Sequence, residues 1–179
     1  AYHEHFSYLS LNTVLAIFSN AGLRVWDVEE LDTHGGSLRI YGCHNESKRP
    51  SSSSVNQILE QEKNHGLMNL SIYSDFQGRA EDIKNNLIEF LIEQKNAGKS
   101  VAAYGAAAKG NTILNYAGIR PDLLPFVCDS APSKQGKYMP GSHIPILPPE
   151  ALKEKKPEYI IILPWNISKE IMDEYSYVK

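Results

Sequence analysis

Hydrophobic positions near the start of the chain predict one helix followed by two strands. An apolar stripe with helical spacing covers residues 11–21, preceded by an N-cap candidate at Ser10. Strand-like runs follow at 23–31 and 37–44, on either side of a glycine pair. Because one helix and two strands cannot enclose a hydrophobic core by themselves, residues 1–44 are expected to be the end of a larger domain.

The middle of the chain is polar at first and then helical in its pattern. Residues 45–54 contain one proline and a run of four serines, a composition typical of linkers. A short helix is predicted over 55–64, and a longer one over 79–97 with apolar residues on one face and Gly98 at its end. Residues 45–98 are therefore interpreted as a linker with helices.

From Ser100 onward, strand-like and helix-like segments alternate. Strands are predicted at 100–104, 125–128, 144–146 and 159–163, and helices at 109–117, 149–155 and 167–177. Such alternation is typical of a parallel sheet with crossover helices. The last strand is apolar throughout and is expected to be buried on both faces, and Asn166 is a candidate cap for the helix after it. Residues 99–179 are thus predicted to form an α/β, Rossmann-like domain with a mostly parallel sheet and flanking helices.

Composition and charge argue against several classes of protein. The 18 lysines and arginines are scattered and the net charge is -3, whereas a nucleic-acid surface needs clustered positive charge. Neither Cys43 nor Cys128 belongs to a C-x-x-C pair, which argues against a metal site and favours two reduced cysteines. No apolar run approaches the ~20 residues of a membrane span, and no signal peptide is evident. The chain is therefore predicted to be cytoplasmic, with no nucleic-acid or membrane partner.

The strongest chemical signal is the loop 105–112, with the sequence GAAAKGNT, between the first strand of the predicted sheet and its first helix. Backbone amides and the positive end of the helix dipole meet at such a turn, and small residues let a phosphate approach. The candidate ligand-binding residues are Gly105, Ala106, Lys109, Gly110, Asn111 and Thr112. The spacing fits neither a Walker loop, in which the lysine follows the second glycine, nor the three-glycine dinucleotide fingerprint. The alternative is that the two glycines only permit a tight turn.

Further candidates lie beyond the second predicted strand of the sheet. Asp129 ends that strand, a position from which an acid commonly accepts hydrogen bonds from ribose hydroxyls. Lys134, Gln135 and Tyr138 belong to a long loop that could close over the same crevice. A solvated acid and an ordinary surface loop are the alternatives.

A second chemical signal stands at the start of the chain, where Tyr2 and His3 are followed by Glu4 and His5. Two histidines with an acid between them suggest proton transfer, because histidine titrates near neutrality and a carboxylate can orient it. The histidines are two residues apart, which suits a strand but places them poorly for a metal on a helix. A fortuitous terminal cluster or a tag remnant is the alternative.

Four segments of the chain, in order, resemble one family. They read YHEHFSYLS, THGGSLRIYG, YGAAAKGNTILNYAGI and CDSAPSKQGKYMPGSHIPI. Together they resemble the C-terminal part of the C-methyltransferases that use S-adenosyl-L-methionine (SAM) and act on nucleotide-linked deoxysugars. In that family a zinc-binding module and the core of a methyltransferase domain come first. The tyrosine-histidine-glutamate-histidine motif follows, and a second, Rossmann-like domain helps to hold the sugar nucleotide.

The resemblance implies a role for each part of the chain. Residues 1–44 would be the closing helix and β-hairpin of the methyltransferase domain, and the partner would be a nucleotide-diphosphate sugar. The family's acid–base residues match Tyr2, Glu4 and His5. His5 would take the proton from the sugar carbon next to the keto group, giving an enolate that attacks the SAM methyl, while Tyr2 and Glu4 steady substrate and base.

One departure from the family is large. The glycine-rich SAM loop and the zinc cysteines are absent, so the chain is expected to be an excised, inactive part without zinc and with most of the SAM site elsewhere. Two other classes stay open: a non-catalytic Rossmann-like module for ligand binding or dimerisation, and a nicotinamide-dependent oxidoreductase, which the missing third glycine weakens. The sequence also leaves open a homo-oligomer.

Overall fold

A computed structural model of the chain describes residues 7–33 and 36–175. These residues divide into two compact units, one that ends at Gln77 and one that begins at Gly78. Among the helices in this described part, none is both long enough and apolar enough to cross a bilayer.

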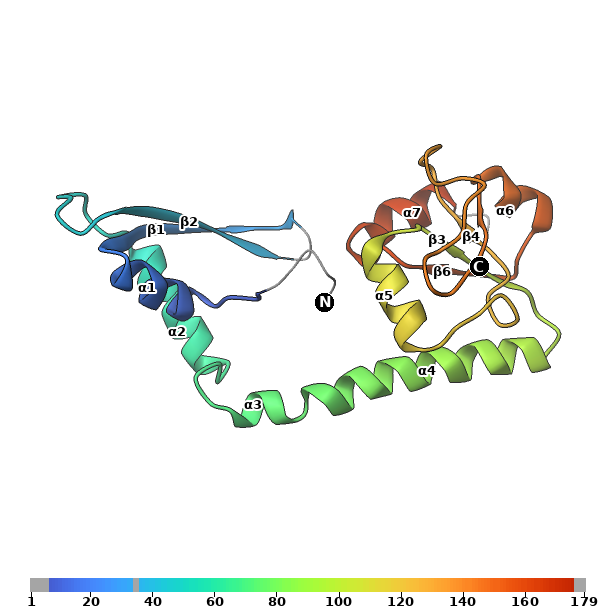
Figure 1. Cartoon of the computed structure of the whole chain (residues 1–179), viewed down its shortest axis with the longest axis horizontal. Coiled ribbons are helices and arrows are strands. Elements are labelled where there is room, and N and C mark those ends of the chain that lie inside the picture. The colour runs from blue at the N-terminus through green and yellow to red at the C-terminus, as the bar shows by residue number, and fades with distance from the viewer. Residues whose placement is uncertain (1–6, 34–35, 176–179) are drawn as a thin grey trace. The chain divides into compact units, whose positions relative to one another are not determined.

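The first unit is an antiparallel hairpin with helices packed on it (Figure 1). Its elements are α1 (Leu11–Asn20), β1 (Leu23–Leu31), β2 (Ser37–His44), α2 (Ser53–Asn64) and the short α3 (Ser71–Ser74). The predicted helix and both strands near the start of the chain are confirmed, and α2 begins two residues before its predicted start. The single turn α3 was not predicted, because four residues are too few to show a periodic pattern.

Both α1 and α2 contribute to the core of this first unit. Its buried apolar side chains come from α1, β1 and α2, and they are Leu11, Val25, Val28, Val55 and Ile58. Residues 45–52, predicted as a linker, contain no helix or strand. They are nevertheless held to β1, because Arg24 donates to the carbonyl oxygen of Ser47 and Ser52 N donates to Trp26 O at 2.7 Å. The helix α2 is thereby brought onto the hairpin.

A buried carboxylate joins the two helices of this unit. Glu62, on α2, is only 8% exposed. Its two carboxylate oxygens accept hydrogen bonds from the backbone amides of Leu11 at 2.5 Å and Asn12 at 3.0 Å. These amides belong to the first turn of α1, where no intrahelical acceptor is available and the helix dipole favours a negative charge. Glu62 therefore stabilises the start of α1 from another helix.

Replacing Glu62 with glutamine should loosen the start of α1. The amide side chain offers one acceptor oxygen in place of two and turns an N–H group toward a backbone donor. Leaving a buried donor without an acceptor costs about 2 kcal/mol, which corresponds to roughly thirtyfold faster hydrogen exchange in the α1 amides. The exposed Glu60 lies on the same helix, so Glu60→Gln is the matched control. Equal exchange rates in the two variants would contradict this role.

The second unit is a four-stranded parallel sheet in the order β5-β4-β3-β6. Its elements are α4 (Phe76–Asn96), β3 (Val101–Tyr104), α5 (Ala108–Tyr116), β4 (Val127–Cys128), β5 (Ile146–Leu147), α6 (Glu150–Lys155), β6 (Tyr159–Ile162), the 3-10 turn η2 (Trp165–Ile167) and α7 (Ser168–Glu174). The helices α4 and α5 cover one face and α6 and α7 the other (Figure 1). The predicted Rossmann-like α/β arrangement is confirmed.

Alternate residues of β3 supply the two cores of this sheet. Val101 and Ala103 pack with α4 and α5, whereas Ala102 and Tyr104 pack with α6 and α7. All four are buried, as expected for a central strand that is covered on both faces. The central position of β3 sets its carboxyl end, and the loop 105–112 after it, in the middle of one edge of the sheet.

Two predictions about the last strand and helix are wrong. The four residues of β6 are each half-buried, because β6 lies at the edge of the described sheet with a neighbour on one side only. Asn166 does not cap a helix. It lies inside the turn η2, and α7 follows at Ser168 without any side-chain cap.

Candidate functional site

The turn between β3 and α5 is held tightly against the end of β6. Gly105 has φ +90°, in the left-handed region, and a Cβ atom at this position would lie 2.4 Å from Cδ of Pro164. A Cβ atom on Gly110 would lie 2.7 Å from Cβ of Leu163. Both glycines therefore permit close packing of the loop on the residues that follow β6, a role that the sequence did not indicate. Neither lines the pocket described below.

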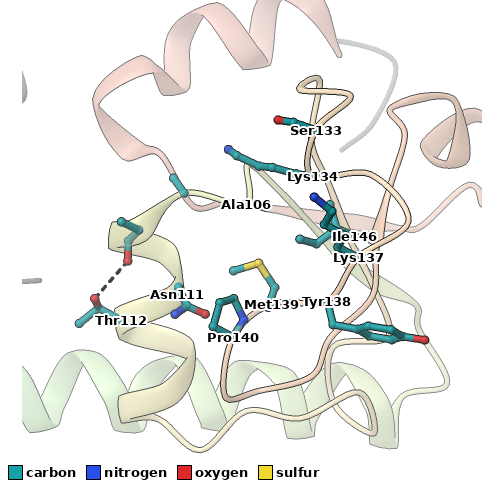
Figure 2. Close-up of a pocket in the computed structure, with 12 residues that line it drawn as sticks. Ala106, Asn111, Thr112, Ser133, Lys134, Lys137, Tyr138, Met139, Pro140 and Ile146 are labelled. Carbon is teal, nitrogen blue, oxygen red and sulfur yellow. Dashed lines mark hydrogen bonds between the residues drawn. The ribbon is translucent and has the colours of Figure 1, made fainter. Parts of the chain in front are cut away.

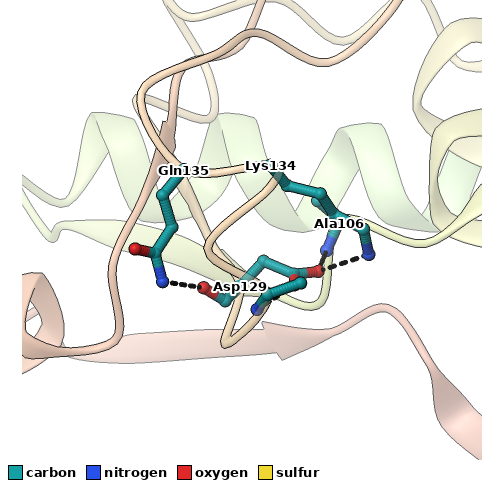
Figure 3. Close-up of polar contacts among 5 residues, drawn as sticks. Ala106, Asp129, Lys134 and Gln135 are labelled. Carbon is teal, nitrogen blue, oxygen red and sulfur yellow. Dashed lines mark hydrogen bonds and ion pairs between the residues drawn. The ribbon is translucent and has the colours of Figure 1, made fainter.

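Asp129 ties this turn to the long loop that follows β4 (Figure 3). One carboxylate oxygen accepts from the backbone amide of Ala106 at 2.7 Å and from Lys134 Nζ at 3.0 Å. The other accepts from Ala131 N at 2.9 Å, and the backbone carbonyl of Asp129 accepts from Gln135 Nε2 at 2.9 Å. Asp129 is 6% exposed and is bound by these protein donors, so it is not the solvated acid of the alternative. The predicted ribose contact stays a prediction.

A pocket of about 450 Å³ lies beside the start of α5 (Figure 2). Its lining comes from the turn after β3, from α5, from the loop after β4 and from β5, and consists of Ala106, Ala107, Ala108, Asn111, Thr112, Ser133, Lys134, Lys137, Tyr138, Met139, Pro140 and Ile146. In Figure 2, Met139 lies between the side chains from α5 and those from the opposite loop.

Half of the ligand-binding residues predicted from the sequence line this pocket: Ala106, Asn111, Thr112, Lys134 and Tyr138. The other half, which do not line it, are Gly105, Lys109, Gly110, Asp129 and Gln135. Lys137 also lines the pocket; it belongs to the loop 134–138 that the sequence singled out, although it was not itself among the candidate ligand-binding residues. Sequence reasoning also missed the apolar floor residues Met139 and Ile146, which carried no chemical signal.

The chemistry of the pocket combines an apolar floor with positive charge. Met139 and Ile146 are buried, and the lysines of the lining are Lys134 and Lys137. Because Lys134 Nζ is paired with Asp129 at 3.0 Å, Lys137 is the lysine of the lining that supplies charge for a ligand. The N-cap of α5 is Ala107, which makes no side-chain hydrogen bond to the first turn. The first-turn amides of α5 therefore have no acceptor from the N-cap side chain, although the Asp129 carboxylate binds the amide of Ala106 just before the helix. Such a pocket can hold a flat or cyclic group on its floor and an anionic group at the start of α5.

Lys109, predicted to face a ligand in the loop 105–112, lies instead over the ring of Trp165. Its Nζ atom lies 5.2 Å from the centre of the Trp165 ring, a cation–π distance, and the residue does not line the pocket. Trp165 itself was not a candidate from the sequence. It is 57% exposed and comes three residues after Ile162, the last residue of β6.

Cys128 is not suited to nucleophilic chemistry. It is fully buried at the end of β4, and burial, reinforced by the negative charge of Glu150, raises the pKa of its thiol to about 12. The thiol therefore stays protonated near neutral pH. Within residues 7–33 and 36–175, no three His, Cys, Asp or Glu side chains gather into a group that could hold a metal ion.

The predicted acid–base residues Tyr2, Glu4 and His5 lie outside the described residues. Their roles stay predictions that rest on the resemblance to the family.

Comparison with known proteins identifies the family. A family model described as the C-methyltransferase C-terminal domain matches residues 32–179. The chain is also 36% identical over 172 residues to the C-methyltransferase NovU of Streptomyces niveus, an alignment that covers 96% of this chain and 41% of that protein. The chain thus spans about two fifths of the relative's length. The resemblance inferred from the four sequence segments is confirmed at this level, and the chain belongs to the family of C-methyltransferase C-terminal domains.

Proposed function

We propose that this chain is the C-terminal part of a SAM-dependent C-methyltransferase that acts on a nucleotide-diphosphate keto-deoxysugar. The reaction class is supported by the family match and by the relative NovU. The observation that carries the substrate class is the pocket beside α5, which combines an apolar floor with two lysines. The unpaired Cys43 and Cys128 suit a reducing compartment such as the cytoplasm.

The pocket suits a nucleotide sugar because it offers the two kinds of contact that such a molecule needs. A ring of the ligand can lie on Met139, Pro140 and Ile146. A diphosphate can then take the start of α5, where the dipole and the first-turn amides favour an anion. Lys137 would neutralise part of its charge. The Asp129–Lys134 pair has a supporting role in this arrangement, because it holds the loop after β4 against the turn at Ala106.

The proposed chemistry takes place at the other end of the chain. His5 removes the proton from the carbon next to the keto group, and the electron pair left on carbon is delocalised into the keto oxygen as an enolate. That carbon then forms the new carbon–carbon bond. Tyr2 and Glu4 hold the substrate and orient the base. SAM, when bound, would supply the electrophilic methyl group, and its sulfur would keep the electron pair of the methyl–sulfur bond that breaks. The glycine-rich turn at 105–112 does not fit SAM, because both glycines pack against Leu163 and Pro164.

Titration of the chain with a nucleotide-diphosphate sugar tests the substrate class. We expect backbone amide shifts at residues 106–108 and 134–140, and about fivefold weaker binding in Lys137→Ala, since one exposed charge contact contributes roughly 1 kcal/mol. Lys137 is a better choice than Lys134, whose removal would also release Asp129.

The matched control is Lys169→Ala, which removes an exposed lysine from α7 of the same unit and should leave binding unchanged. Shifts confined to other residues, or equal affinity in the Lys137 and Lys169 variants, would count against the pocket. Unchanged binding together with an altered oligomeric state would instead favour a dimerisation module.

A further inference from the structure

Trp165, the one tryptophan of the second unit, is exposed to solvent and does not pack into either core of the sheet. It is 57% exposed and follows the end of β6 after Leu163 and Pro164, at the carboxyl end of a parallel sheet. Tryptophan is usually well buried, because its ring contributes a large apolar area. The carboxyl ends of parallel strands are also the edge at which open α/β sheets bind ligands. An exposed indole at this place therefore points to a ligand contact.

The residues before Trp165 are fixed to the β3–α5 turn. Pro164 is the residue that a Cβ atom on Gly105 would strike, and Leu163 is the residue that a Cβ atom on Gly110 would strike. Leu163 N also donates to Tyr104 O at 3.0 Å. These contacts hold the segment that presents Trp165 at the same edge as the turn. Its indole is therefore carried by a rigid part of the fold.

The sheet order places Trp165 and the pocket on opposite sides of this turn. The pocket residues Lys134 to Pro140 come from the connection between β4 and β5, which lie on one side of β3. Trp165 follows β6, which lies on the other side of β3. Lys109, in the first turn of α5, reaches toward Trp165 with its ammonium group. A ligand whose diphosphate lies at the start of α5 would thus extend to both sides.

We propose that Trp165 and Lys109 form a second subsite, which binds the hexose ring of the nucleotide sugar and the phosphate attached to it. This inference rests on the proposed function. The nucleoside occupies the pocket on the β4 side, where sheets of this topology place it, and the sugar falls on the β6 side. The C–H face of a hexose packs on the indole ring, whose electron-rich face attracts the weakly positive hydrogens. The Lys109 ammonium moves from the ring toward the sugar-bearing phosphate.

Tryptophan fluorescence gives a direct test, because the chain has two tryptophans and only one lies in this unit. The other, Trp26, packs on Tyr41 in the hairpin. In a Trp26→Phe variant the indole emission comes from Trp165 alone. We expect thymidine or uridine diphosphate glucose to change this emission. The corresponding nucleoside diphosphate, which keeps the phosphate that attracts Lys109 but lacks the hexose, should change it clearly less.

Affinities measured by calorimetry separate the contributions of the ring and the phosphate. Trp165→Ala should weaken binding of the diphosphate glucose about tenfold and leave the nucleoside diphosphate within about twofold. Trp165→Phe keeps an aromatic face and should recover most of the loss. Lys109→Ala should weaken both ligands, since the phosphate beside the lysine is present in each of them.

Three other outcomes would overturn the proposed subsite, and each differs in what it means for the proposed function. Equal losses for both ligands in Trp165→Ala, or an equal emission change with both, would assign the indole to the nucleobase or to the fold. Amide shifts at 106–108 without any response of Trp165 would remove the subsite and leave the proposed function intact. If neither ligand binds, both the subsite and the proposed function are contradicted.

Discussion

Under the proposed function, a longer protein that joins this chain to its SAM-binding part should lose turnover about a thousandfold when His5 is replaced by asparagine, while SAM still binds. Asparagine keeps a polar side chain of similar size but cannot take a proton, and a positioned general base contributes roughly 10²–10⁴-fold to the rate. Carbon next to a keto group becomes a nucleophile only after deprotonation, so no later step can compensate for the loss. The measurements are kcat with the keto-sugar substrate and the Kd for SAM.

The neighbouring histidine provides the matched control for this prediction. His3 lies two residues before His5, and His3→Asn makes the same chemical change in the same segment. It should keep most of the activity if His5 is the base. Near-normal turnover in His5→Asn would remove His5 from the mechanism, and equal losses in both variants would indicate that the segment is merely disturbed.

The second large effect is expected on stability, from Gly105→Ala. The new methyl group would stand 2.4 Å from Cδ of Pro164, and the residue would keep φ near +90°, which side chains rarely adopt. The proline ring cannot rotate away as a flexible side chain would. Strain and overpacking together should cost about 3 kcal/mol of unfolding free energy. Urea unfolding followed by Trp165 fluorescence in the Trp26→Phe background reports on this unit.

Gly118→Ala separates the two causes of that loss. Gly118 has φ +67°, and a Cβ atom added there would meet nothing within 4 Å, so its substitution adds backbone strain without a collision. It should cost about 1 kcal/mol. If Gly105→Ala costs no more than Gly118→Ala, the packing of Pro164 on the turn is looser than the structure shows.

Periodicity along the chain was sufficient to predict most helices and strands. The runs at 23–31 and 37–44 form strands with the predicted bounds, and alternation after Ser100 predicted the parallel sheet. The errors came at places where the position of an element in the sheet outweighs its local sequence pattern. The apolar run of β6 resembled a central strand, although its place at the edge leaves it half-buried.

The site was predictable in part, because residue type and loop position indicate chemistry but not partners. The loops at 105–112 and 134–138 were both singled out, and both contribute to the pocket. Which side chains enter it depended on contacts between distant residues. The Asp129 carboxylate accepts hydrogen bonds from Ala106, Ala131 and Lys134, so its role in the described structure is to join two loops of the fold.

The amino-acid sequence alone therefore established the Rossmann-like class, the family and the glycine-rich turn after the first strand of the sheet. These features are encoded locally, in repeating hydrophobic positions and short motifs. Only the tertiary structure decided that the glycines serve packing on Leu163 and Pro164, and that Lys109 lies over Trp165. Such pairings join residues more than 50 positions apart, and they are set by how helices and strands pack together, which no local pattern contains.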